Sequence, residues 1–227
     1  AKQAGLLGKD LWVKFPQRML LGKPRAYVLR QLFADVLCGV DVYEDVADRD
    51  YQVADVVALL ESSPPGVLHT GSLMAMPPEH HKVLQIVAVA KRLGWTISVD
   101  VNLRPRVAHD VPAYLQAVRE VAALADWLKA SDEDLELLGF TDVSLSNASN
   151  LAAHWMAQGC SRVALTFGAQ GAYLQVGNVH AQGAAPVVEV TDTVGAGDTF
   201  WGSCLADWVL HNSLNKIGRA SCRERVS

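Results

Sequence analysis

The sequence has few charged residues and no long apolar run. Charged side chains make up 19% of its 227 residues, and the formal net charge is −4. A nucleic-acid-binding surface needs a basic face that neutralises phosphates, so this balance predicts no nucleic-acid partner. No uninterrupted apolar stretch reaches the roughly 18 residues of a membrane-spanning helix, so we expect no membrane partner.

Cysteine is also scarce, and its four positions are scattered along the chain. Cys38, Cys160 and Cys204 are isolated, and the fourth, Cys222, lies in a C-terminal segment discussed below. No C-x-x-C pair occurs, which argues against a structural zinc site. Free thiols without a disulfide framework predict a protein of the reducing cytoplasm.

What the sequence does contain is a regular alternation of apolar strands and helices from about residue 46 onward. This alternation predicts an α/β fold with a doubly wound, mostly parallel sheet flanked by helices. In such sheets, ligands bind at the carboxyl ends of the strands. The expected strands cover residues 67–70, 96–101, 126–129, 162–167, 171–175 and 187–190, and the expected helices cover 53–60, 78–93, 111–124, 132–138 and 151–158.

The most informative stretch is residues 190–200, VTDTVGAGDTF, where an apolar strand meets a small-residue turn that opens into an apolar helix. Gly195 and Gly197 have no side chain that would hold a phosphate away from the backbone. The first N–H groups of a helix lack intrahelical partners and carry the positive end of its dipole, so this turn predicts an anion site. Asp198 would repel a bound phosphate, and its presence makes sense as a base that takes a proton from an attacking hydroxyl.

The segment DTVGAGDTF at residues 192–200 resembles the second signature of the PfkB/ribokinase family of sugar kinases. The resemblance implies Asp198 as the catalytic base and Gly195, Ala196 and Gly197 as the anion hole. It also implies a ribokinase-like fold, here without the β lid of the family, that uses ATP and Mg²⁺ to phosphorylate a small-molecule sugar.

A second candidate motif is Asp100-Val101-Asn102-Leu103-Arg104, which follows an expected strand and keeps the polar positions of the family's D-x-N-x-R. Asn102 offers both a donor and an acceptor to sugar hydroxyls, and Arg104 offers a delocalised cation to phosphate or carboxylate oxygens. The resemblance implies that both bind substrate, together with Asp198. The alternative is a turn in which Asp and Asn cap backbone groups.

The run Lys129-Ala130-Ser131-Asp132-Glu133-Asp134 follows the next strand and resembles the family's N-x-x-E motif. The resemblance implies that Asp134 organises Mg²⁺ through water near the triphosphate, with Lys129 and Ser131 on the nucleotide side. Asp stands here for the family's longer Glu. The alternative is a capping box, in which Ser131 and Asp134 satisfy backbone groups at the start of a helix.

Thr166, Gly168 and Gly171 resemble the family's T-x-G-x-x-G segment. The resemblance implies that they line the phosphates and ribose of the nucleotide. A β-hairpin turn explains the same glycines, and both interpretations can hold together. Asp192, with the carbonyl of Val194, matches positions that bind a monovalent cation such as K⁺ in some family members.

The sequences of the two motifs around residues 100–105 and 129–134 most resemble those of fructokinases. The sequence therefore predicts an ATP-dependent sugar kinase, with fructose as the first candidate substrate. The alternatives are 2-keto-3-deoxygluconate kinase, ribokinase and nucleoside kinase. A hypothesis of another class is that the chain itself is an inactive nucleotide-binding fragment.

The two ends of the sequence do not resemble a sugar kinase. Residues 1–45 lack the expected sugar-binding start, residues 46–215 match a partial kinase core, and residues 216–227 resemble a translated sequencing adapter. The adapter match itself covers residues 217–226, and setting aside its three Arg and one Glu moves the net charge from −4 to −6. We therefore expect a gene fragment cut at both ends. For the full-length parent, the resemblance implies a homodimer, since members of the family often dimerise through the lid.

Overall fold

The computed structural model describes residues 52–185 and 195–210. The chain divides into two compact units, residues 1–55 and 56–227, and the sheet belongs entirely to the second. The expected strand at 187–190 and the candidate cation-binding residue Asp192 lie outside the described residues.

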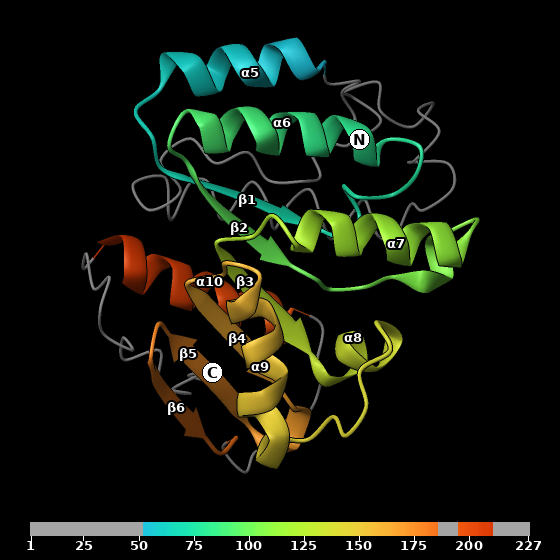
Figure 1. Cartoon of the computed structure of the whole chain (residues 1–227), viewed down its shortest axis with the longest axis vertical. Coiled ribbons are helices and arrows are strands. Elements are labelled where there is room, and N and C mark those ends of the chain that lie inside the picture. Colours follow the sequence, from blue (N-terminus) through green and yellow to red (C-terminus); the bar gives the residue numbers. More distant parts are fainter. Residues whose placement is uncertain (1–51, 186–194, 211–227) are drawn as a thin grey trace, which may run out of the picture. The chain divides into compact units, whose positions relative to one another are not determined.

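Helices and strands alternate through the second unit, as the sequence predicts (Figure 1). The strands are β1 (Val67–Gly71), β2 (Thr96–Asp100), β3 (Trp127–Ser131), β4 (Arg162–Thr166), β5 (Ala172–Val176) and β6 (Val179–Gly183). The α-helices are α5 (Val53–Ser62), α6 (His80–Arg92), α7 (Val111–Ala122), α8 (Asp132–Leu137), α9 (Ala148–Ala157) and α10 (Ala196–Leu210). Short 3-10 turns cover Pro105–Val107, Leu145–Asn147 and Gly168–Gln170.

The described strands form one six-stranded sheet in the order β1-β2-β3-β4-β5-β6. The neighbours from β1 to β4 pair in parallel, whereas β4–β5 and β5–β6 pair antiparallel. The predicted fold class, a mostly parallel α/β sheet flanked by helices, is confirmed. Strand β6 was not predicted, because all five of its residues are exposed and they carry no apolar alternation.

The two faces of the sheet are covered by different helices. Parallel crossovers are nearly always right-handed, so consecutive neighbours β1 to β4 place the helices between them on one face. Helices α6, α8 and α9 contact strands β2, β3 and β4 respectively. Helix α10, coloured red in Figure 1, packs on the opposite face.

Helix α10 is anchored to the sheet by three buried side chains. Trp201, Cys204 and Trp208 are each at most 1% exposed and pack in one cluster with apolar side chains of three strands: Trp127, Ala164, Leu174 and Val176. Alternate strand residues point to the same face. The α10 face of the sheet therefore also carries the residues next in register toward the carboxyl ends: Asp100, Lys129, Ser131 and Thr166.

No helix within the described parts of the chain is both long and apolar enough to span a membrane.

Candidate active site

The first turn of α10 lies at the carboxyl ends of the parallel strands and presents Asp198 to solvent. Gly195 has a φ of +83°, a left-handed conformation that favours glycine. Its carbonyl accepts both the backbone N–H and the hydroxyl of Thr199, each at 2.8 Å, which starts the helix. The N–H groups of this first turn have no intrahelical acceptors, so they can bind an anion beside Asp198.

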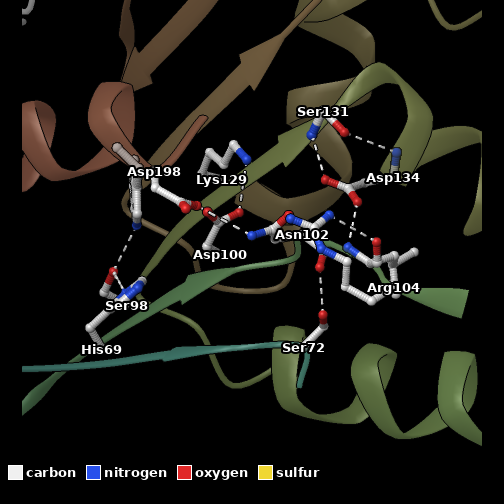
Figure 2. A network of polar contacts seen from close by, with 12 residues as sticks. His69, Ser72, Ser98, Asp100, Asn102, Arg104, Lys129, Ser131, Asp134 and Asp198 are labelled. Carbon is white, nitrogen blue, oxygen red and sulfur yellow. Dashed lines mark hydrogen bonds and ion pairs between the residues drawn. The ribbon is translucent and has the colours of Figure 1, made fainter. Parts of the chain in front are cut away.

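Asn102 holds the carboxylate of Asp198 from the end of β2 (Figure 2). Its side-chain amide donates to Asp198 Oδ1 at 3.3 Å, across the space between β2 and α10. The backbone of Asn102 has a φ of +33°, which few residues other than glycine adopt readily. Ser72 fixes that conformation, because its hydroxyl donates to the Asn102 carbonyl at 2.6 Å. A residue from the loop after β1 thus fixes Asn102, and Asn102 in turn orients Asp198.

Asp100 and Lys129 form a buried ion pair beside this turn, at the carboxyl ends of β2 and β3. Lys129 Nζ lies 3.0 Å from Asp100 Oδ1, and the side chains are 4% and 6% exposed. Burial raises the pKa of Asp100 from 3.8 to about 6, although Lys129 opposes the shift. The negative charges of Asp134 and Asp198 add to this rise in the pKa of Asp100.

A second set of hydrogen bonds joins α10 to the sheet at Ser98, two residues before Asp100 on β2. The indole N–H of Trp201 donates to Ser98 Oγ at 3.1 Å, and Ser98 Oγ lies 3.0 Å from His69 Nδ1. Although His69 is an exposed residue, desolvation by its surroundings lowers its pKa. Asp198 acts in the opposite direction and raises the pKa of His69. These hydrogen bonds fix the start of α10 relative to β2.

Ser131 and Asp134 form the capping box that was the alternative for their motif. Ser131 Oγ accepts the backbone N–H of Asp134 at 3.1 Å, and Asp134 Oδ2 accepts that of Ser131 at 2.8 Å. Asp134 Oδ1 accepts a second backbone N–H, that of Leu103, at 2.7 Å. Because the Asp134 side chain is buried and both its oxygens are engaged, the carboxylate ties β3 to the loop that carries Asn102.

Arg104 does not lie beside Asp198 in this structure. Figure 2 shows it on the far side of Asn102, near Asp134. Its guanidinium donates to the Leu103 carbonyl at 3.2 Å, and its backbone N–H donates to the Tyr114 hydroxyl at 3.0 Å. The Arg104 side chain is exposed, so binding of a substrate by Arg104 requires another rotamer of this long side chain.

Thr166, Gly168 and Gly171 surround the turn from β4 to β5. Thr166 is the register partner of Ser131 on β3, which places it at the carboxyl ends of the strands. Gly168 and Gly171 have φ values of +50° and +118°. A Cβ on Gly171 would lie 2.0 Å from the Gly183 carbonyl, so this glycine is required by the close approach of β6. The hairpin interpretation therefore explains Gly171, and the nucleotide interpretation of the segment stays a prediction.

The geometry brings together Asp198, Gly195, Ala196, Gly197, Asn102 and Lys129. The model of the pfkB family of carbohydrate kinases matches residues 50–223, well over half of the chain. The chain belongs to the pfkB family.

Two curated pfkB relatives that align with this chain are named as sugar kinases. A fructokinase from Rhizobium leguminosarum bv. trifolii is 32% identical over 183 residues, which cover 81% of this chain and 54% of the relative. A 2-dehydro-3-deoxygluconokinase from Bacillus subtilis (strain 168) is 34% identical over 112 residues, 48% of this chain and 33% of the relative. The chain spans about half the length of the first of these curated relatives, and less of the second.

A solved pfkB-type structure confirms the fold. The crystal structure of a fructokinase from Vibrio cholerae O395, with fructose, ADP and calcium ion bound, has a TM-score of 0.61. It is 28% identical, and the match covers 77% of this chain and 53% of that one.

Three residues of this pfkB site were missed by sequence reasoning. Ser72 and His69 sit in or after a short strand with no motif around them. Asp100 was recognised as part of a motif but given no role. Its role could have been found, because the register of parallel strands places Asp100 directly beside Lys129 on the same face.

Proposed function

We propose that this chain is the base-bearing part of a kinase that transfers the γ-phosphoryl group of ATP to a sugar hydroxyl. The single observation that supports this most is the placement of Asp198. Its carboxylate sits in the first turn of an α-helix, at the carboxyl ends of the strands, and is held by the amide of Asn102. A base beside an anion site is what proton removal from an attacking hydroxyl requires.

In this proposal, each group at the site has a separate task. Asp198 takes the proton of the sugar hydroxyl as it attacks, and the N–H groups of Gly195, Ala196 and Gly197 stabilise the charge of the transferring phosphoryl group. Asn102 orients Asp198 and offers its remaining polar atoms to the sugar, while Arg104 turns toward substrate or phosphate. Catalysis of this kind is mostly positioning and electrostatic stabilisation.

ATP fits this site better than a protein-bound metal does. The start of α10 provides backbone donors for phosphate, with Thr166, Gly168, Lys129 and Ser131 proposed on the nucleotide side. Within residues 52–185 and 195–210, no group of three His, Cys, Asp or Glu side chains is arranged to hold a metal ion. Because the Asp134 carboxylate already accepts two backbone N–H groups, those of Ser131 and Leu103, we propose Mg²⁺ as an ion carried by the nucleotide, with Asp134 acting at most through water.

Fructose is the first candidate substrate, because a fructokinase aligns over most of this chain. The motifs that contain Asn102 and Lys129 also resemble those of fructokinases in sequence. 2-Keto-3-deoxygluconate is the second candidate, on the strength of the aligned Bacillus relative. Ribose and nucleosides follow. The remaining hypothesis of another class, an inactive nucleotide-binding fragment, predicts ATP binding without turnover.

The test compares this 227-residue chain with a longer chain expressed from the uninterrupted source gene. ADP release is followed with ATP, Mg²⁺ and, in turn, fructose, 2-keto-3-deoxygluconate, ribose and inosine. We expect fructose-dependent ADP release from the longer chain. ADP release that no sugar stimulates would contradict the kinase proposal.

The Asp198→Asn variant of whichever chain is active separates the base from the anion site. General-base catalysis is typically worth about 10²–10⁴-fold, so we expect at least that loss in kcat. ATP affinity should stay within about threefold, because the amide keeps the shape of the carboxylate and removes a charge that repels phosphate. Equal turnover by the variant would remove Asp198 from the role of base.

A further inference from the structure

His69 lies on the face of the sheet that α10 covers, and it makes a contact that the proposed function does not use. His69 and Ser98 are register partners on β1 and β2. His69 Nδ1 lies 3.0 Å from Ser98 Oγ (Figure 2), and the same oxygen accepts the indole N–H of Trp201 at 3.1 Å. Two strands and helix α10 therefore meet at one hydroxyl group.

The buried hydroxyl of Ser98 determines the direction of these hydrogen bonds. Ser98 is 0% exposed. Because an indole N–H can only donate, Trp201 takes a lone pair of Ser98 Oγ, and the hydrogen of that hydroxyl still needs an acceptor. In the part of the chain that the structure describes, His69 Nδ1 is the acceptor within hydrogen-bonding distance. A neutral imidazole that accepts at Nδ1 carries its proton on Nε2.

The surroundings of His69 favour the neutral ring that this arrangement needs. Desolvation lowers the pKa of His69 from 6.5, and Lys129 on β3 acts in the same direction. A hydrogen bond with the backbone of Ser98 and the negative charge of Asp198 on α10 act to raise the pKa of His69, but the net shift is downward. His69 is therefore neutral at pH 7.5, and acid protonates it only below its ordinary pKa.

We propose that neutral His69 is a positioning residue: by accepting the Ser98 hydroxyl it completes the hydrogen bonds that hold Trp201, and through Trp201 it fixes the place of Asp198. Trp201 comes three residues after Asp198 in α10, which is slightly less than one helical turn. This inference rests on the proposed function, in which Asp198 is the base. It assigns to His69 no contact with the substrate.

Protonation of His69 breaks this arrangement. A protonated ring has a hydrogen on both nitrogens, so His69 Nδ1 and Trp201 Nε1 would then both donate to Ser98 Oγ. The Ser98 hydrogen loses its acceptor in a buried place, which is costly, so one of the two contacts must lengthen or turn away. Small displacements of a catalytic group slow a reaction strongly. The inference therefore predicts a loss of turnover at acid pH that depends on His69 and not only on Asp198.

Two substitutions separate the acceptor at His69 from its charge. Asn places its side-chain oxygen about where Nδ1 lies in His and does not titrate, so His69→Asn keeps the acceptor at every pH. His69→Phe keeps a flat ring and removes the acceptor. His180→Asn is the matched control, because His180 is an exposed residue of β6 that stacks on Tyr173. Because His69 is also exposed, we expect all three variants to fold, which their Tm values check.

The first measurement is NMR of the 227-residue chain, because it does not depend on turnover. Couplings between ring protons and ring nitrogens report which nitrogen of His69 carries the proton. The indole N–H signal of Trp201, assigned among the six tryptophans by Trp201→Phe, reports the hydrogen bond to Ser98. We expect a proton on Nε2 of neutral His69, and a Trp201 signal that shifts as His69 is protonated. His69→Asn should lack this shift, and His69→Phe should displace the signal at every pH.

The second measurement is the pH profile of kcat in the longer chain. At pH 7.5 we expect His69→Phe to lose about tenfold in kcat, with KM for ATP and sugar within about twofold, because the base is displaced while the ligands still bind. His69→Asn should stay within about twofold at pH 7.5. Relative to the unmodified chain, it should gain activity as the pH falls to 5. His180→Asn should match the unmodified chain throughout.

A double-mutant cycle tests whether His69 acts through Ser98. Ser98→Ala removes the shared hydroxyl, so we expect about the same tenfold loss in kcat as for His69→Phe. The two changes together should lose about tenfold and not about a hundredfold, because either one alone already breaks the arrangement. Losses that multiply would show that His69 acts independently of Ser98, and they would overturn the proposal.

Three other results would also overturn the proposal. They are a proton on Nδ1 of neutral His69, a Trp201 signal that does not respond to His69→Phe, and an unchanged kcat in His69→Phe. Failure of the proposed function gives a different result. If no sugar stimulates ADP release while the Trp201 signal follows His69, the kinase function is contradicted and the hydrogen bonds from His69 to Trp201 stand.

Discussion

Two buried cations lie on the same face of the sheet, and their charges are stabilised in different ways. Arg162, at the amino end of β4, is 2% exposed and lies between two indole rings, 4.4 Å from the centre of Trp127 and 4.6 Å from that of Trp208. Lys129, near the carboxyl end of β3, is paired with a carboxylate 3.0 Å away. One cation is surrounded by aromatic faces, and the other is held by an opposite charge.

The difference separates the part of the sheet that stabilises the fold from the part that we propose binds ligands. The aromatic surroundings of Arg162 do not change with pH, because indole rings do not titrate. The same rings also pack as hydrophobic groups. The carboxylate of Asp100 does titrate, and its neighbours Lys129 and Asp198 belong to the proposed site. We therefore expect changes at the amino end to affect mainly stability, and changes at the carboxyl end to affect stability and ligand binding together.

The largest loss of stability should come from Trp208→Ala at the amino end. Trp208 is 1% exposed, packs against Trp127 and Trp201 with ring centres 5.4 and 5.5 Å apart, and covers one side of Arg162. Removing a buried Trp side chain typically costs about 3–5 kcal/mol of unfolding free energy, measured by urea denaturation. Val209→Ala is the matched control, because Val209 is 55% exposed and should change stability by less than about 0.5 kcal/mol. Equal losses at the two positions would mean that this cluster does not support the fold.

The next largest effect should be the contrast between Lys129→Met and Lys91→Met. The first leaves Asp100 buried without its partner, which typically costs about 3–5 kcal/mol of unfolding free energy. The second breaks the ion pair of Lys91 with Asp126, which is more than 30% exposed on both sides, and such pairs are worth about 0–1 kcal/mol. Urea denaturation of both variants at pH 7.5 measures the contrast. Similar values would show that burial does not distinguish the two pairs.

Asp100 should also make stability depend on pH. Its pKa of about 6 in the fold lies above its ordinary value of 3.8, so the folded chain binds this proton more tightly than the unfolded chain does. The resulting stabilisation is complete below about pH 4 and is lost as the pH rises to about 6, a fall of roughly 3 kcal/mol in unfolding free energy. Unfolding measured at steps of pH should show that Asp100→Asn removes this fall. A variant that keeps the same fall would assign it to other groups.

The smallest effect should appear at Asn102, where backbone and side chain can be separated. Asn102→Ala places an ordinary residue at a φ of +33° and should lose about 1 kcal/mol of unfolding free energy, whereas Asn102→Gly should lose less. Both variants lack the amide that holds Asp198, so both should lose turnover equally in the longer chain. If the Gly variant alone kept activity, backbone conformation rather than the amide would be what the site needs.

Much of the fold could be predicted from the sequence, because strands β2, β3 and β4 are mostly buried apolar runs and the helices have clear apolar spacing. Strands β1 to β5 and the described helices all fall close to their expected places. Strand β6 escaped prediction, since an exposed edge strand such as Val179–Gly183 needs no apolar pattern and is defined by pairing with β5.

The site was predictable only where a motif is continuous in sequence. Gly195 to Asp198 form such a motif, and Asp198 lies in the first turn of α10, as the motif predicts. The partnership of Asp100 with Lys129 and the support of Asn102 by Ser72 depend on strand register and loop packing, which no local pattern contains. The motif of Asp134 allowed both candidate roles, and only the folded chain shows the two backbone N–H groups, of Ser131 and Leu103, on its carboxylate.

The hydrogen bonds that hold α10 have a consequence for synthesis of the chain on the ribosome. The bond from Asn102 to Asp198 joins residues 96 positions apart, and the bond from Trp201 to Ser98 joins residues 103 apart. At about 5–20 residues per second, the ribosome needs roughly 5 to 20 seconds to pass from one partner to the other. During that interval β2 and β3 can pair and bring Asp100 beside Lys129, but the nascent chain has no Asp198, so the proposed base is among the last parts of the site to be added.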